Sequence, residues 1–188
     1  MIPMLVLASA SPRRQELLRN AGIAFEVLPA HIPEDPFPGE NAKDCAERLA
    51  REKAFAIAQI RPNEAVLGAD TVVVIDDQIL GKPADAADAA RMLRLLSGHT
   101  HQVITGVCLV VAGQVSMSSE TTTVTMDKIT DAEIADYIGS GEPMDKAGAY
   151  AIQGIASRWI PRIEGDFSNV VGLPVALVYR MLRQVGLK

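Results

Sequence analysis

Cysteine, aromatic residues and long apolar runs are all scarce in this 188-residue chain. Its two cysteines, Cys45 and Cys108, lie far apart and form no Cys-x-x-Cys pair, which argues against a disulfide framework and a structural zinc site. No apolar run reaches the length of about 18 residues that a membrane span needs, and no basic segment with an apolar core opens the chain. We therefore expect a cytoplasmic protein with reduced thiols, no export signal and no membrane anchor.

Positive charge is also in short supply. The chain has 18 Lys and Arg residues against 23 Asp and Glu residues, for a formal net charge of −5. General nucleic-acid and membrane-surface binders need a sustained basic face, so we expect neither kind of partner. Any site for an anionic ligand must therefore be local.

Several common catalytic signatures are missing as well. The chain has no Gly-x-x-x-x-Gly-Lys-Ser/Thr loop, no Gly-x-Gly-x-x-Gly and no Gly-x-Ser-x-Gly. The three histidines, His31, His99 and His101, do not have the spacing of metal ligands. These absences argue against a P-loop enzyme, a Rossmann dinucleotide site and a serine-elbow hydrolase.

The sequence does contain helical and strand-like stretches that alternate along its length. Helices are predicted over 12–21, 41–59, 85–96, 130–138 and 174–185, and strands over 4–7, 25–28, 65–67, 72–75, 101–111, 115–126, 159–163 and 167–171, with a short strand ahead of Gly81. Hairpin turns at 112–114 and 164–166 indicate antiparallel pairs among these strands. We therefore predict an α/β fold with a mixed, twisted sheet and flanking helices, as one domain over residues 1–188 without a long linker.

The start of the first helix has an unusual charge. Ser11 is a good N-cap and Pro12 suits the first helical position. The first turn, where the helix dipole favours acidic residues, instead carries Arg13 and Arg14. Together with the hydroxyls of Ser9 and Ser11 and the free backbone N–H groups, these arginines form a candidate phosphate site. The alternative is an ordinary capped helix with two solvated arginines.

Four further charged residues fit the same chemistry. Asp70 lies between two apolar runs, and Glu34 lies on a proline-rich loop. Such carboxylates suit Mg²⁺, which combines few protein ligands with substrate phosphates, while Lys53 and Lys82 suit a polyphosphate. Taken singly, Asp70 could bind loop amides at a strand end, and the others could be solvated surface charges. In one cleft, these residues would indicate phosphoryl chemistry.

A segment of small residues, 145–154, contains Gln153. Small residues let a backbone approach a ligand closely. The amide of Gln153 can match the N3–H and O4 of uracil or thymine, and a flipped amide matches cytosine equally well. This residue alone leaves the base open.

The ordered motifs of the chain resemble those of the Maf family of nucleoside triphosphate pyrophosphatases over essentially its whole length. The motifs are Ser9-Ala10-Ser11-Pro12-Arg13-Arg14, Arg48-Leu49-Ala50-Arg51-Glu52-Lys53-Ala54, Gly68-Ala69-Asp70-Thr71, Gly81-Lys82-Pro83, Leu96-Ser97-Gly98, Gly141-Glu142-Pro143, the run from Asp145 to Gly154, and Val170-Val171-Gly172-Leu173-Pro174. The Ala-Gly-Ala-Tyr-x-Ile-Gln-Gly form is similar to the branch that hydrolyses dTTP and UTP. Ala151 departs from the Gly that is frequent there.

This resemblance implies a role for each matching residue. Asp70 would be the catalytic carboxylate, and Arg13, Thr71 and Gln153 would determine substrate choice. The phosphates would meet Ser9, Ser11, Arg13, Arg14, Lys53 and Lys82, and a divalent cation, Mg²⁺ or Mn²⁺, would meet Glu34 and Asp70.

The resemblance also implies an elongated, two-lobed Maf/ITPase-like fold with a central cleft, in a homodimer. Three alternatives stay open: the sibling branch that acts on 7-methyl-GTP, a housecleaning enzyme for modified pyrimidine nucleotides, and a non-catalytic nucleotide-binding regulator of septum formation and cell division.

Overall fold

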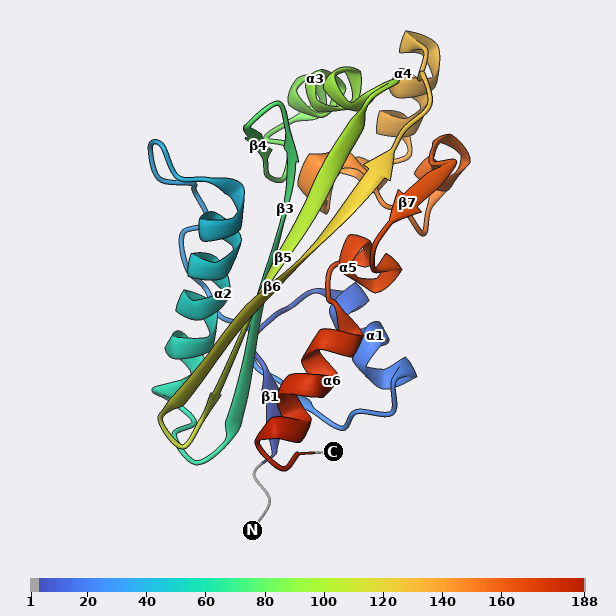
Figure 1. The fold of residues 1–188 in the computed structure, drawn as a ribbon. Coiled ribbons are helices and arrows are strands. Elements are labelled where there is room, and N and C mark those ends of the chain that lie inside the picture. The colour runs from blue at the N-terminus through green and yellow to red at the C-terminus, as the bar shows by residue number, and fades with distance from the viewer. Residues whose placement is uncertain (1–3, 188) are drawn as a thin grey trace.

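Seven strands build a mixed sheet that the helices cover (Figure 1). In residues 4–187, which this computed structural model describes, the strands are β1 (Leu5–Leu7), β2 (Glu26–Val27), β3 (Ala65–Ile75), β4 (Gln78–Leu80), β5 (Thr100–Val111), β6 (Gln114–Thr125) and β7 (Arg162–Glu164). β1 runs parallel to β2 and β3, and the other pairs are antiparallel. The strand order is β2-β1-β3-β5-β6-β7 with β4 beside β3, which confirms the predicted mixed α/β class.

The helices that the sequence predicts begin at the expected N-termini. They are α1 (Pro12–Asn20), α2 (Ala42–Ala58), α3 (Ala86–Leu96), α4 (Asp131–Gly139), α5 (Phe167–Val171) and α6 (Val175–Gln184), with short 3₁₀-helices η1 (Glu142–Asp145), η2 (Ala147–Ala149) and η3 (Ile155–Trp159). Ser11 accepts a hydrogen bond from the N–H of Arg14, and Asn41 accepts one from Asp44. No helix within residues 4–187 is long and apolar enough to cross a membrane.

Strand alternation divides the core between the helices. On β1, Leu5 and Leu7 pack with α1 and α6, whereas Val6 packs with α2 on the other face. On β3, Leu67 belongs to the first group and Val66 to the second. Neighbouring residues of β3 therefore face different helices.

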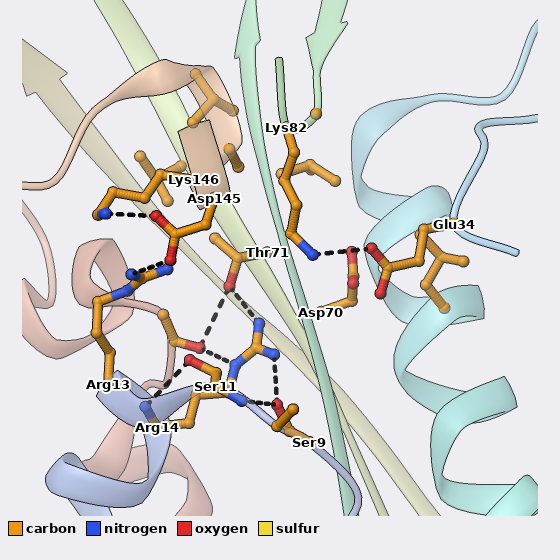
Figure 2. Close-up of a pocket in the computed structure, with 18 of the residues that line it drawn as sticks. Ser9, Ser11, Arg13, Arg14, Glu34, Asp70, Thr71, Lys82, Asp145 and Lys146 are labelled. Atoms are coloured by element: carbon orange, nitrogen blue, oxygen red, sulfur yellow. Dashed lines mark hydrogen bonds and ion pairs between the residues drawn. The ribbon is translucent and has the colours of Figure 1, made fainter. Parts of the chain in front are cut away.

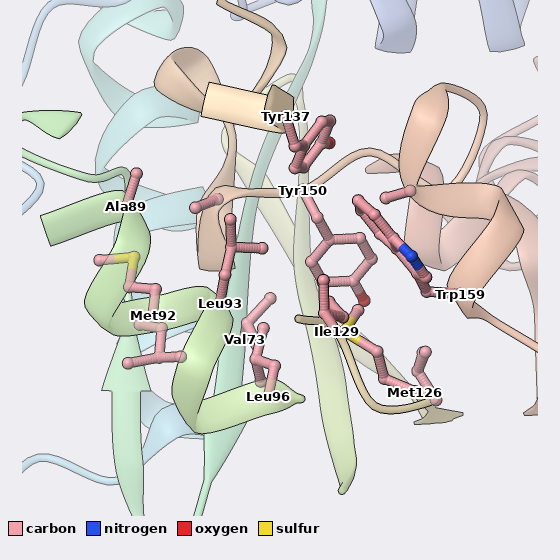
Figure 3. Packing of buried hydrophobic residues seen from close by; sticks show 14 of the residues in the cluster. Val73, Ala89, Met92, Leu93, Leu96, Met126, Ile129, Tyr137, Tyr150 and Trp159 are labelled. Atoms are coloured by element: carbon pink, nitrogen blue, oxygen red, sulfur yellow. The ribbon is translucent and has the colours of Figure 1, made fainter. Parts of the chain in front are cut away.

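A separate apolar cluster packs α3 and α4 against the last residues of β3 and the first residues of β5 (Figure 3). Leu93 and Leu96 of α3 meet Val73 of β3, and Tyr137 of α4 meets Trp159 edge to face. This packing anchors α4 and the 3₁₀-helices beside the long strands.

The structure corrects three predicted segments. Residues 68–71, predicted to separate two strands, are part of a continuous β3, because β5 pairs with that strand from Val66 to Val74. Residues 167–171, predicted as a strand, form α5, because Asp166 accepts hydrogen bonds from the N–H groups of Ser168 and Asn169 and so caps a helix. The strand predicted over 159–163 starts later, at Arg162, because η3 occupies the chain up to Trp159.

Candidate active site

A cavity of about 740 Å³ opens beside the middle of β3 (Figure 2). β1 pairs with residues 65–67 of this strand and β4 with residues 73–75, so within the described chain no strand covers that edge at residues 68–72. Successive side chains of a strand point to opposite faces, and an uncovered edge gives both faces access to one space. Asp70 and Thr71 accordingly both line the cavity.

The ammonium group of Lys53 joins two carboxylates in this cavity. Its Nζ lies 2.6 Å from Oδ1 of Asp70 and 2.6 Å from Oε1 of Glu34. Lys82 reaches the same glutamate, with Nζ 3.3 Å from Oε2 (Figure 2). Lys53 and Asp70 are only 5% and 7% exposed, so solvent screens their attraction little.

Burial and charge act against each other on these two acids. Burial raises the pKa of Asp70, and the positive charges of Lys53 and Arg14 oppose that rise. Burial also favours a higher pKa for Glu34, but hydrogen bonds and charges from Lys53 and Lys82 outweigh it and lower the pKa. Glu34 is therefore the more firmly ionised of the two.

Two glycines let α2 lie close enough to the sheet for these contacts. A Cβ on Gly68 would lie 2.7 Å from the backbone N of Ala54 and 2.9 Å from its Cβ. A Cβ on Gly106 of β5 would lie 2.6 Å from the backbone N of Glu47. All three distances are shorter than van der Waals contact, so a side chain at either position would push α2 outward.

The guanidinium group of Arg14 is buried on the other side of β3. Its Nε donates to the carbonyl oxygen of Gly172 at 2.7 Å, Nη1 to the hydroxyl of Ser9 at 3.1 Å, and Nη2 to the hydroxyl of Thr71 at 3.0 Å (Figure 2). Arg14 is 9% exposed. It thereby ties α1, β3 and the chain after α5 together and adds a fixed positive charge to the cavity.

Arg13, by contrast, makes one long contact across the cavity. Its Nη1 lies 3.5 Å from Oδ2 of Asp145, whose other oxygen lies 2.6 Å from Nζ of Lys146 (Figure 2). The Asp145 side chain is 66% exposed, and exposed ion pairs of this kind contribute little to the free energy of unfolding. A ligand with more negative charge can therefore take Arg13 from Asp145.

Gln153 lies on a segment whose backbone is held from both sides. The hydroxyl of Tyr137 accepts a hydrogen bond from the N–H of Ala151 at 3.2 Å, and the carboxylate of Glu142 accepts one from Ile155 at 3.1 Å. The amide group of Gln153 makes no hydrogen bond to any other part of the described chain. A fixed backbone with a free amide is suited to recognising the edge of a base.

A buried histidine contacts the same segment through Tyr150. Nε2 of His101 lies 2.7 Å from the hydroxyl of Tyr150, and the two rings meet edge to face. Burial lowers the pKa of His101 to about 4, so its imidazole is neutral near pH 7. The pair fixes Tyr150 against the wall of the cavity.

Residues 4–185 of the chain match the family model described as Maf-like protein. The chain belongs to the Maf family. A relative from Koribacter versatilis, named dTTP/UTP pyrophosphatase, is 62% identical over 182 residues, which cover 97% of this chain and 94% of the relative. Relatives of the same name from Citrifermentans bemidjiense and Geobacillus sp. are 52% and 48% identical, and these matches cover 97% of this chain and 95% and 98% of the relatives. The resemblance seen in the motifs is confirmed.

The fold brings all the predicted site residues of this Maf chain to one cavity. Its lining includes Ser9, Ser11, Arg13, Arg14, Glu34, Lys53, Asp70, Thr71, Lys82 and Gln153. The catalytic, binding and specificity roles assigned to them stay predictions.

Sequence reasoning missed two charged residues in the same Maf cavity, Asp145 and Lys146. Their signal was the charged pair that opens the segment 145–154.

The two acidic residues fit a divalent cation that draws most of its ligands from elsewhere. Among residues 4–187, no group of three or more His, Cys, Asp or Glu side chains could hold a metal. Glu34 and Asp70 nevertheless converge on one positive group, the Lys53 ammonium. Because Mg²⁺ binds through one or two carboxylates plus phosphate oxygens and water, this donor set fits a cation that arrives with a phosphate ligand.

Proposed function

We propose that this Maf-family chain hydrolyses dTTP and UTP to the nucleoside monophosphate and pyrophosphate. The observation that carries the proposal is the cavity at the β3 edge, where a buried carboxylate, Asp70, lies among the cations Arg13, Arg14, Lys53 and Lys82. A cavity of about 740 Å³ suits a nucleotide-sized ligand. The names of relatives that are 48–62% identical support the choice of substrates.

The triphosphate would lie between α1 and α2. The hydroxyls of Ser9 and Ser11 offer hydrogen bonds to phosphate oxygens, and Arg13 offers a half-buried guanidinium group. Lys53 and Lys82 approach from the opposite wall. Together these groups neutralise charge on the phosphates and on the departing pyrophosphate.

Asp70 would act on the attacking water. The oxygen of water forms a bond to the α-phosphorus, the bond from that phosphorus to the α,β-bridging oxygen breaks, and the bridging oxygen leaves with pyrophosphate. The Asp70 carboxylate orients the water and takes its proton. A carboxylate is a weak base for water. A Mg²⁺ or Mn²⁺ ion held by Glu34 and Asp70 would lower the pKa of the attacking water and so make this proton transfer easier.

Base choice would depend on Arg13, Thr71 and Gln153. The Gln153 amide can pair with N3–H and O4 of uracil or thymine. Thr71 accepts a hydrogen bond from Arg14 beside Arg13, so the phosphate and specificity residues are in contact. A change at one of them is expected to affect the others.

The test is pyrophosphate release from dTTP, UTP, CTP, GTP, 7-methyl-GTP and a modified pyrimidine triphosphate, each with Mg²⁺ and with Mn²⁺. The proposal expects the highest kcat/KM with dTTP and UTP. A preference for 7-methyl-GTP would move the chain to the sibling branch, and a preference for the modified nucleotide would favour housecleaning. Nucleotide binding without any pyrophosphate release would favour the cell-division regulator.

We further propose that the chain works as a cytoplasmic homodimer without a nucleic-acid partner. The family resemblance supports the dimer, and the buried free thiols of Cys45 and Cys108 support a reducing compartment. The net charge of −5 argues against nucleic acid. Sedimentation equilibrium tests the dimer, and fractionation of cells tests the compartment.

A further inference from the structure

Glu34 reaches the cavity from a segment without helix or strand. The chain between β2 and α2 forms neither over residues 28–41. Even so, the carboxylate of Glu34 must lie within hydrogen-bond distance of Lys53 and Lys82. Its position therefore depends on side-chain contacts that fix the segment.

Arg48 of α2 makes most of these contacts. Its Nε and Nη2 donate to the two carboxylate oxygens of Glu40 at 2.7 and 2.8 Å, and Nη2 also donates to the carbonyl oxygen of Asp35 at 3.1 Å. The ring of Phe37 stacks on the guanidinium group, with Cζ 3.8 Å from the ring centroid. Arg48 thus holds three residues of the segment at once, and we call residues 35–40 with Arg48 the clasp.

The polar groups of the clasp are paired with one another and are partly shielded from solvent. The side chains of Arg48 and Glu40 are 17% and 9% exposed, and the remaining nitrogen of Arg48, Nη1, donates to Glu52 at 3.3 Å. The contact with Arg48 is strong enough to lower the pKa of Glu40 to about 2. It also explains why the large apolar side chain of Phe37 is 57% exposed, since its ring covers a cation.

Arg48 itself does not line the cavity, and all three of its nitrogens are engaged by protein groups. It has no group left for a phosphate. Any effect on the reaction must pass through the segment that it holds. Asp35, which the clasp fixes, is the immediate neighbour of Glu34.

We propose that Arg48 is a positioning residue for the reaction, which fixes residues 35–40 and so places Glu34 against Lys53 and Lys82. The inference rests on the proposed function. Lysine cannot replace Arg48 in this role, because a single ammonium group cannot bind both oxygens of Glu40 side by side or stack flat on Phe37.

The experiment compares Arg48→Met and Arg48→Lys with Arg94→Met. Arg94 is a matched control, because its guanidinium group pairs with Asp131 at 2.8 Å away from the cavity. Hydrogen exchange at the amides of Phe37 and Glu40, which donate to Oε2 of Glu40 and to the carbonyl oxygen of Phe37, should quicken about 10-fold or more in both Arg48 variants and stay unchanged in the control. The value of kcat/KM for dTTP should fall by about 10²-fold in Arg48→Met, mainly through kcat.

A double-mutant cycle with Glu34→Gln separates positioning from a general structural role. Without the Glu34 carboxylate its placement no longer matters, so adding Arg48→Met should cost less than about 3-fold in kcat/KM. Independent, multiplying losses would overturn the proposal, as would unchanged hydrogen exchange at the amides of Phe37 and Glu40. If the unaltered protein releases no pyrophosphate from any triphosphate, the proposed function fails, while the exchange measurement still decides whether Arg48 orders the segment.

Discussion

The substitution Gly68→Ala tests whether the close approach of α2 to the sheet creates the Lys53–Asp70 contact. The added methyl group would meet the backbone of Ala54, with its N at 2.7 Å, and the carbonyl oxygen of Ala50. Ordinary contact starts at 3.4 Å, and helix backbone cannot turn aside as a flexible side chain can. We therefore expect α2 to move outward by about 1 Å, which would take Lys53 Nζ from 2.6 Å to roughly 3.6 Å from Asp70, beyond hydrogen-bond range.

Both stability and activity should respond. Overpacking of this kind costs about 1–3 kcal/mol in the free energy of unfolding, which is a fall in Tm of about 2–12 °C for a chain of this size. A misplacement of about 1 Å at the reacting groups costs on the order of 10²-fold in kcat/KM. Thermal unfolding and pyrophosphate release from dTTP measure the two effects.

Gly139→Ala is the matched control, because no atom lies within 4 Å of its Cβ position. It should leave kcat/KM unchanged and Tm equal or slightly higher, since alanine suits a helix better than glycine. Gly68→Ala with full activity would refute the argument that the glycine sets the Lys53–Asp70 distance, even if its Tm fell.

Three further predictions concern individual side chains. Asp70→Asn should fold, since Asn can still accept a hydrogen bond from Lys53, but should lower kcat by about 10²–10⁴-fold; near-normal turnover would remove Asp70 from the reaction. Burial holds the pKa of His101 at about 4 in the folded protein, against 6.5 in the unfolded chain. Between these pH values the folded protein binds fewer protons than the unfolded chain, so the free energy of unfolding falls by about 3 kcal/mol as the pH falls from 6.5 to 4. His101→Gln should flatten the dependence of Tm on pH in that window, and an unchanged slope would contradict the assignment. Gln153→Ala should leave the free energy of unfolding within about 0.5 kcal/mol, while kcat/KM for dTTP falls by about 10-fold; an unchanged kcat/KM would show that another group reads the base.

Local signals in the sequence predicted much of the fold. Ser11, Asn41 and Thr130 cap helices in the structure as predicted, and the hairpin around Gly113 joins β5 and β6. These features depend on residues within a few positions of one another, so no knowledge of the distant chain is needed. The ordered motifs likewise identified the family and the residues that meet in the cavity.

Only the tertiary structure decided how those residues are placed relative to one another. Pairing with β5 carried β3 through Gly68 and Asp70, which sequence patterns had split into two strands, and Asp166 turned an apolar run into α5. The uncovered edge of β3 depends on where β1 ends and β4 begins. Hydrogen-bond pairing between distant segments fixes these features, and no local pattern encodes it.

Long-range contacts also assigned the partners of each charge. Arg14, predicted as a phosphate ligand, is held by Gly172, 158 positions away, and Lys53 joins two carboxylates that the sequence separates. Arg48 lay in a motif whose purpose the sequence did not reveal, until the fold placed Glu40 and Phe37 against it. The sequence by itself determined which chemical groups the protein has, and the fold decided which of them face one another, because burial and packing act between residues that are far apart in the chain.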